Sequence, residues 1–171
     1  MGCSKMLPTA PVEDPIQAFR AEELWPTSPA SLAGWLQTFS AEGSQEFGRK
    51  GGKLKLEAEC FKKLEFKVPK DALSGTVVIS MSVRLFNYLR DGELQKGFFV
   101  DFGPDALVFA KPAKLKMEIR ELEANDGEIL RLYWHNPSTG LWEVQQEVEV
   151  TGKKKKTEFD ISHFSRYAIS R

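Results

Sequence analysis

The stretch KLKLEAECFKKLEFKV, residues 53–68, decides the fold class because its apolar residues recur at every second position. In residues 53–60 leucine and alanine alternate with lysine and acidic side chains, and residues 63–68 repeat the pattern with leucine, phenylalanine and valine. A period of two turns one set of side chains toward a core and the other toward solvent. The stretch therefore predicts two half-buried β-strands.

The same alternation recurs along the rest of the chain. The clearest case is residues 77–85, where Ser80, Ser82 and Arg84 are expected on the outer face of a longer strand. Glycine, proline, asparagine and aspartate clusters separate the segments and are typical of turns. Further strands are expected at 97–102, 113–119, 128–135, 141–150 and 156–162. Eight short strands of this kind, with no helices between them, predict an all-β fold, an antiparallel β-sandwich over residues 50–171.

The part before residue 50 follows different patterns. Residues 1–13 are polar and contain proline, so we expect a flexible leader. Residues 14–49 are expected to form a short helical segment and linker, with helices over 15–24 and 29–40 that each begin at a capping residue followed by proline. Residues 40–52 are rich in glycine and predict a connector. The second helix has an apolar stripe that would pack on the sandwich or in a groove of a partner, formed by Leu32, Trp35, Leu36 and Phe39.

The composition weighs against several classes of function. Lysine and arginine total 24 and aspartate and glutamate total 24, so no net charge attracts nucleic acid. No segment reaches the length of about 20 apolar residues that spans a bilayer. The only histidines, His135 and His163, have no cysteine nearby, so no metal site of the zinc type is expected, and a calcium site made of carboxylates alone is the open alternative. No cofactor is expected either.

Five motifs in sequence order resemble the ZU-five domain, the β-sandwich named after zonula-occludens proteins and netrin receptors and also found in ankyrins. They are Gly51-Gly52, Val68-Pro69 with Ala72-Leu73, Gly103-Pro104 through Lys111-Pro112, Thr139-Gly140 with Trp142, and His163 to Ser165. The resemblance covers residues 50–170. It implies structural roles for the prolines and glycines, and large core side chains at Phe109 and Trp142.

The resemblance implies binding rather than catalysis, because the family consists mainly of interaction modules in multidomain proteins. We therefore expect a non-catalytic module for interaction or surface display that binds a protein partner, and no enzyme. A carbohydrate-binding module is an alternative, since tryptophans can stack on sugars. The candidate pairs are Trp134 with Trp142 and Trp25 with Trp35.

The segment DISHFSRYAIS, residues 160–170, raises a second alternative. Some relatives with a terminal His-Phe-Ser cleave themselves between Phe and Ser. Here Ser165 would attack the preceding carbonyl, His163 would take the proton, and Phe164 would hold the backbone in a strained form. We expect the chain to stay intact and the motif to be structural, because cleavage would yield only residues 165–171. The pattern also requires a bend or bulge near Ser162.

The leader contains one candidate for modification. "CSK" at residues 3–5 resembles the mature start of a bacterial lipoprotein, in which Cys3 would carry lipid. The myristoylation pattern fits less well, because it requires serine or threonine where this chain has Met6. A plain flexible terminus is the third possibility. A lipid at Cys3 would anchor the sandwich to a membrane at the extracytoplasmic surface or in the periplasm; the alternative location is the cytoplasm.

Overall fold

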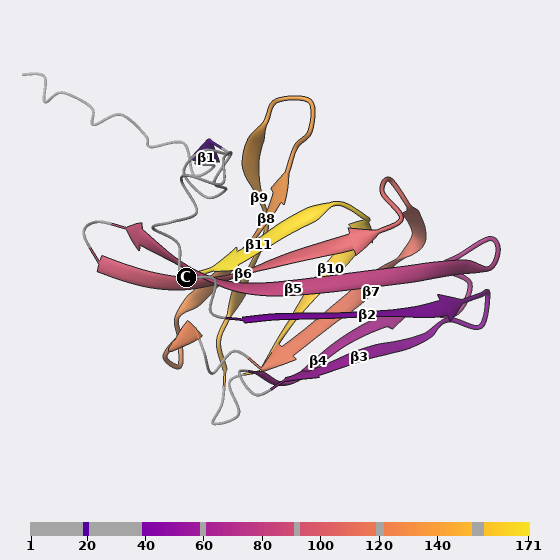
Figure 1. The fold of residues 1–171 in the computed structure, drawn as a ribbon, viewed down its shortest axis with the longest axis horizontal. Helices are drawn as coiled ribbons and strands as arrows, with labels where there is room; N and C mark the ends of the chain where they lie inside the picture. Colours follow the sequence, from indigo (N-terminus) through magenta and orange to yellow (C-terminus); the bar gives the residue numbers. More distant parts are fainter. Residues whose placement is uncertain (1–18, 21–38, 59–60, 91–92, 119–121, 152–155) are drawn as a thin grey trace, which may run out of the picture.

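The computed structural model describes residues 19–20, 39–58, 61–90, 93–118, 122–151 and 156–171. These residues form two antiparallel sheets that pack face to face (Figure 1). One sheet has seven strands in the order β1-β9-β8-β11-β6-β5-β2, and the other has four in the order β10-β7-β4-β3. The predicted all-β fold and antiparallel sandwich are confirmed. No helix in the described part of the chain is long and apolar enough to cross a membrane.

The chain passes from one sheet to the other several times, so each sheet contains strands from separate parts of the sequence. The seven-stranded sheet contains β1 (Phe19–Arg20), β2 (Phe39–Phe47), β5 (Val77–Arg90), β6 (Glu93–Gly103), β8 (Ile129–His135), β9 (Leu141–Glu149) and β11 (Arg166–Ser170). The four-stranded sheet contains β3 (Gly52–Ala58), β4 (Phe61–Val68), β7 (Val108–Glu118) and β10 (Lys156–His163).

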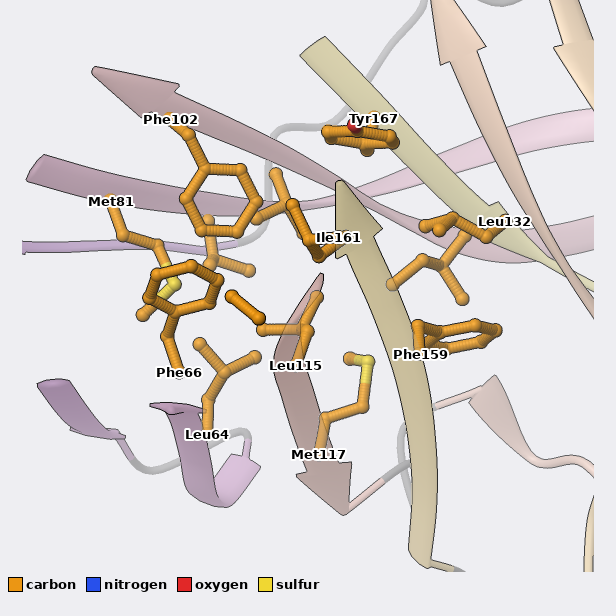
Figure 2. Packing of buried hydrophobic residues seen from close by; sticks show 14 of the residues in the cluster. Leu64, Phe66, Met81, Phe102, Leu115, Met117, Leu132, Phe159, Ile161 and Tyr167 are labelled. Carbon is orange, nitrogen blue, oxygen red and sulfur yellow. The ribbon is translucent and has the colours of Figure 1, made fainter. Parts of the chain in front are cut away.

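The core lies between the sheets and follows the alternation seen in the sequence. On β4, Leu64 and Phe66 are fully buried and Val68 is 2% exposed. On β5, residues 79, 81, 83 and 85 point into the core, and Ser80 and Ser82 lie on the opposite face. Figure 2 shows side chains from both sheets meeting in this layer. Burial of this apolar surface is the main force that holds the sheets together.

A second, smaller apolar cluster lies on the outer face of the seven-stranded sheet. Phe99 and Ala168 belong to it, whereas their neighbours along β6 and β11 point into the main core. The rings of Phe86 and Phe99 stack with centroids 4.0 Å apart, and Trp142 is fully buried beside them. The predicted core roles of Trp142 and Phe109 are confirmed, but Trp142 lies in this outer cluster.

Gly51 shows why the turn before β3 needs glycine. Its φ is +70°, in the left-handed region that favours glycine. A Cβ atom at this position would also come within 2.3 Å of the carbonyl oxygen of Val68. Both constraints arise because β3 and β4 pair from Gly52 and Val68 onward, directly beside the turn.

The segment before residue 50 differs from the prediction where it is described. Phe19 and Arg20, expected in a helix, pair with Trp142 and Leu141 as strand β1. Residues 40–47 of the glycine-rich stretch expected as a connector instead belong to β2, which pairs with β5 over nine residues, and residues 48–51 connect β2 to β3. Phe39 and Ser40, expected at the end of the second helix, begin that strand. The leader and the rest of the predicted helices lie outside the described residues.

The segment around residue 163 contains the end of β10 and the start of β11. β10 lies in the four-stranded sheet, whereas β11 lies in the middle of the other sheet between β6 and β8. The predicted bulge near Ser162 is confirmed, because the register of β10 against β7 shifts between Ile161 and His163. The bulge precedes the corner at which the chain changes sheets.

Candidate functional site

The His-Phe-Ser motif forms the corner between β10 and β11. Phe164 is 2% exposed and its ring stacks on Phe102, with centroids 4.9 Å apart and 8° between the planes. It also meets Phe109 edge-on at 5.0 Å. The backbone N–H of Phe164 donates to the carbonyl oxygen of Leu107 at 2.7 Å. Phe164 therefore fixes the corner in the core of the sandwich.

His163 is held against the edge of the core. Its ring meets the ring of Trp134 edge-on at 5.2 Å, and its carbonyl oxygen accepts a 2.7 Å hydrogen bond from the Tyr167 hydroxyl. Burial raises the pKa of Tyr167 above its usual value, so this hydroxyl keeps its proton. The Nε2 atom of His163 is buried and has no hydrogen-bond partner among the described residues.

Self-cleavage would require Ser165 to pass its proton to a base during attack. Because Nε2 of His163 is unpartnered, it makes no hydrogen bond with the Ser165 hydroxyl. The Ser165 carbonyl oxygen accepts from the backbone N–H of Phe102 at 3.3 Å, which continues the ladder of β11 with β6. The described non-glycine residues with positive φ are Asp71, Ala106 and Glu123, all outside this corner. The geometry favours a structural anchor, and the intact chain stays a prediction.

A hollow of about 510 Å³ lies on the outer face of the seven-stranded sheet, across β2, β5 and β6. Strand register builds it in two rows, one from Glu42, Ser82 and Asp101 and one from Ser44, Ser80 and Gly103. The side chains are short in five of these six positions, which leaves space above the backbone. Hydroxyl and carboxylate oxygens line the hollow, so it suits groups that donate hydrogen bonds or carry positive charge.

Asp101, on β6, lines the side of the hollow that lies away from β2. One carboxylate oxygen accepts from the Arg84 guanidinium at 2.5 Å, and the other lies 3.5 Å from Nε of Arg166. The positive charges of Arg84 and Arg166 compensate the negative charge of the Asp101 carboxylate. On the side toward β2, the hollow is lined by the exposed Glu42, which is the charged residue that β2 contributes to it.

The outer face of the four-stranded sheet carries alternating charges instead. Lys114 bridges Glu158 at 3.2 Å and Asp160 at 2.6 Å, and Lys116 bridges Glu158 at 2.6 Å. The hydrogen bond from Lys116 and then that from Lys114 lower the pKa of Glu158, against the raising effect of burial. These groups compensate one another, which is typical of a solvated face. Of the lysine run 153–156, only Lys156 is described, and it begins β10.

The tryptophans that were candidates for stacking on a sugar are placed differently. Trp142 is fully buried, and half-buried Trp134 packs against the main core and His163. Trp25 and Trp35 lie outside the described residues, as does the lipidation candidate Cys3. Within the described ranges, no group of three or more histidine, cysteine, aspartate or glutamate side chains is placed to hold a metal ion.

Neither the hollow nor strand β2, which lines it, was predicted from the sequence. The available signal was weak: serine and glutamate alternate with alanine, glycine and glutamine over residues 40–46, but no large apolar side chain marks a buried face. No model of a known protein family matches the chain, and no curated protein matches it either. The described residues thus offer two candidate features, the His-Phe-Ser corner and the open edge at β2 with its adjoining hollow.

Proposed function

We propose that this chain is a non-catalytic interaction module that binds a protein partner by adding a strand to β2. The observation that supports this proposal is the free edge of β2. It pairs with β5 through nine consecutive residues, and no described strand pairs with its other side. The outward N–H and C=O groups of such an edge are ready to bond an extended segment.

The hollow supplies the second requirement of strand addition, which is selection among partner side chains. An added strand would place every second side chain on the outer face, next to Glu42 or Ser44 at the rim of the hollow. Glu42 favours a cationic or hydrogen-bond-donating side chain opposite it. Backbone bonds would thus supply affinity, and the hollow would supply specificity.

Amide exchange of a peptide complex tests this proposal directly. Nine-residue peptides matching the length of β2 are selected from a displayed library on the immobilised chain, and the best binder is added to the free protein. Amides of residues 39–47 that do not bond to β5 should gain protection, at every second position. Protection confined to another surface, such as the four-stranded sheet, would contradict binding at β2.

The ZU-five resemblance and display through Cys3 also remain proposals. The order of motifs in the sequence and the sandwich itself support the ZU-five resemblance. Mass spectrometry of the protein from its native host would detect a lipid on residues 2–3. An unmodified terminus would remove the anchor proposal and leave the interaction proposal intact.

A further inference from the structure

The outer face of β2 carries the charges of that strand. The residues that point inward on β5 pair with positions 39, 41, 43, 45 and 47, so the even-numbered residues of β2 point outward. These outward residues are all exposed, and they are Ser40, Glu42, Ser44 and Glu46. The edge strand therefore presents two acids, four residues apart, with a serine between them.

Within the described part of the chain, no lysine or arginine forms an ion pair with Glu42 or Glu46. Arg84 lies on the same face of β5, but it donates to the aspartate of β6 at 2.5 Å. Arg49 and Lys50 follow in the turn after β2, and neither is within ion-pair distance of Glu46. The two carboxylates leave this edge with negative charge that the described residues do not compensate.

The hollow leaves space for a long side chain beside Glu42. Ser82 faces Glu42 across the strand pair, and Ser44 is the next outward residue on β2. Their hydroxyl oxygens can accept hydrogen bonds, as the carboxylate can. A guanidinium or ammonium group that is brought to Glu42 would thus find both an opposite charge and further acceptors.

We propose that the partner segment that adds to β2 is basic, with lysine or arginine opposite Glu42 and Glu46 and a small polar residue between them, opposite Ser44. This inference rests on the proposed function and names the chemistry of its partner. Cross-strand pairs of opposite charge stabilise an added strand. The pattern reads the same in both chain directions, so it applies to parallel and to antiparallel addition.

The neighbouring edge strand β3 has the opposite charge. β3 lies against β2, with Leu56 packed at Gly43. Its exposed outward residues are Lys53, Lys55 and Glu57, which leave it with a net positive charge. Like charges in cross-strand positions are destabilising, and lysines on an edge discourage pairing. A basic segment is therefore directed to β2 rather than to β3.

Synthetic nine-residue peptides test the charge pattern on the full chain. One peptide has two lysines four positions apart, serine between them, and valine and threonine elsewhere; alanine or glutamate replaces both lysines in the matched peptides. From the usual size of two cross-strand charge pairs, the lysine peptide should bind about two- to thirtyfold more tightly than the alanine peptide. The glutamate peptide should bind more weakly than the alanine peptide. Fluorescence anisotropy of labelled peptides measures each dissociation constant, and the differences should shrink at about 1 M salt.

Charge reversal on the protein is the reciprocal test. The double variant Glu42→Lys with Glu46→Lys should bind the glutamate peptide more tightly than the lysine peptide. The matched control is Glu57→Lys with Glu149→Lys, which changes the net charge equally at exposed glutamates of β3 and β9 and should keep the original order. All four positions are exposed, so neither double variant should shift the denaturation midpoint appreciably.

Failure of this inference and failure of the proposed function give different results. Peptides that protect alternate amides of residues 39–47 but bind equally with lysine, alanine or glutamate overturn the basic partner and leave strand addition in place. A preference for lysine that the reversal at Glu42 and Glu46 does not change also overturns the basic partner, because the charges then act at another surface. No protection of β2 by any peptide, selected or designed, overturns both. Protection of β2 together with a lysine preference that the reversal inverts supports both.

Discussion

Replacing Phe164 by alanine tests whether the His-Phe-Ser corner is a structural anchor. Phe164 is 2% exposed, its ring stacks on Phe102, and it contacts Phe109 and Phe66 with centroids 5.0 and 5.7 Å away. Truncating a buried phenylalanine removes its transfer free energy and leaves a cavity, which together cost about 3–5 kcal/mol. For a chain of this size, that loss corresponds to a fall in Tm of about 6–20 °C.

Urea denaturation, followed by tryptophan fluorescence, would measure the loss in the free energy of unfolding. Phe164→Leu keeps part of the volume and should cost less, about 1–2 kcal/mol. The control is Val78→Ala, because Val78 is 59% exposed and its truncation should change stability by no more than about 0.5 kcal/mol. A loss below about 1 kcal/mol for Phe164→Ala, at an unchanged denaturant slope, would refute the anchor role.

Three further predictions concern the turn at β3, the Phe164–Ser165 bond and the charged face. Gly51→Ala should destabilise the protein by more than about 1 kcal/mol in urea denaturation, whereas Gly75→Ala should change little because an added Cβ there has nothing within 4 Å. The Phe164–Ser165 bond should stay intact, so mass spectrometry under denaturing conditions after days at neutral pH should give one full-length mass, as for Ser165→Ala; a fragment only in the parent would contradict this. The pKa of Glu158 is lowered in the folded state, so its stabilising contribution is present above its unfolded pKa and is lost as pH falls through the folded value. Acid titration of stability should therefore show a shallower decline for Glu158→Gln, and an unchanged decline would count against the ion pairs.

The strands that could be predicted from sequence are those that bury one regular face. Residues 53–68 and 77–85 alternate because each lies between the core and solvent. β2 escaped prediction because its inward positions include Ala41, Gly43 and Gln45, none of which shows a hydrophobic period. The side chain of Leu56 on β3 packs against Gly43. The inner face of β2 is therefore covered there by a residue of another strand.

The candidate features, too, could be predicted only in part from the sequence. His163, Phe164 and Ser165 could be selected because they are consecutive, and the bulge before them followed from the apolar pattern. The hollow could not, because it depends on Ser44, Ser80 and Gly103 meeting in register across three strands. Contacts between residues so far apart in sequence are set by tertiary pairing, which local patterns do not encode.

The place of β11 has a consequence for the order of folding. Its five residues join the β9-β8 side of the large sheet to the β6-β5-β2 side, and among the described strands of that sheet each side reaches the other only through β11. A nascent chain that has not yet released residues 166–170 from the ribosome can form these sides only as separate sheets. Closure of the large sheet is then a late, long-range event, and topologies dominated by such contacts fold slowly. During synthesis, the edges of β6 and β8 stay open to pairing with other chains until that strand arrives.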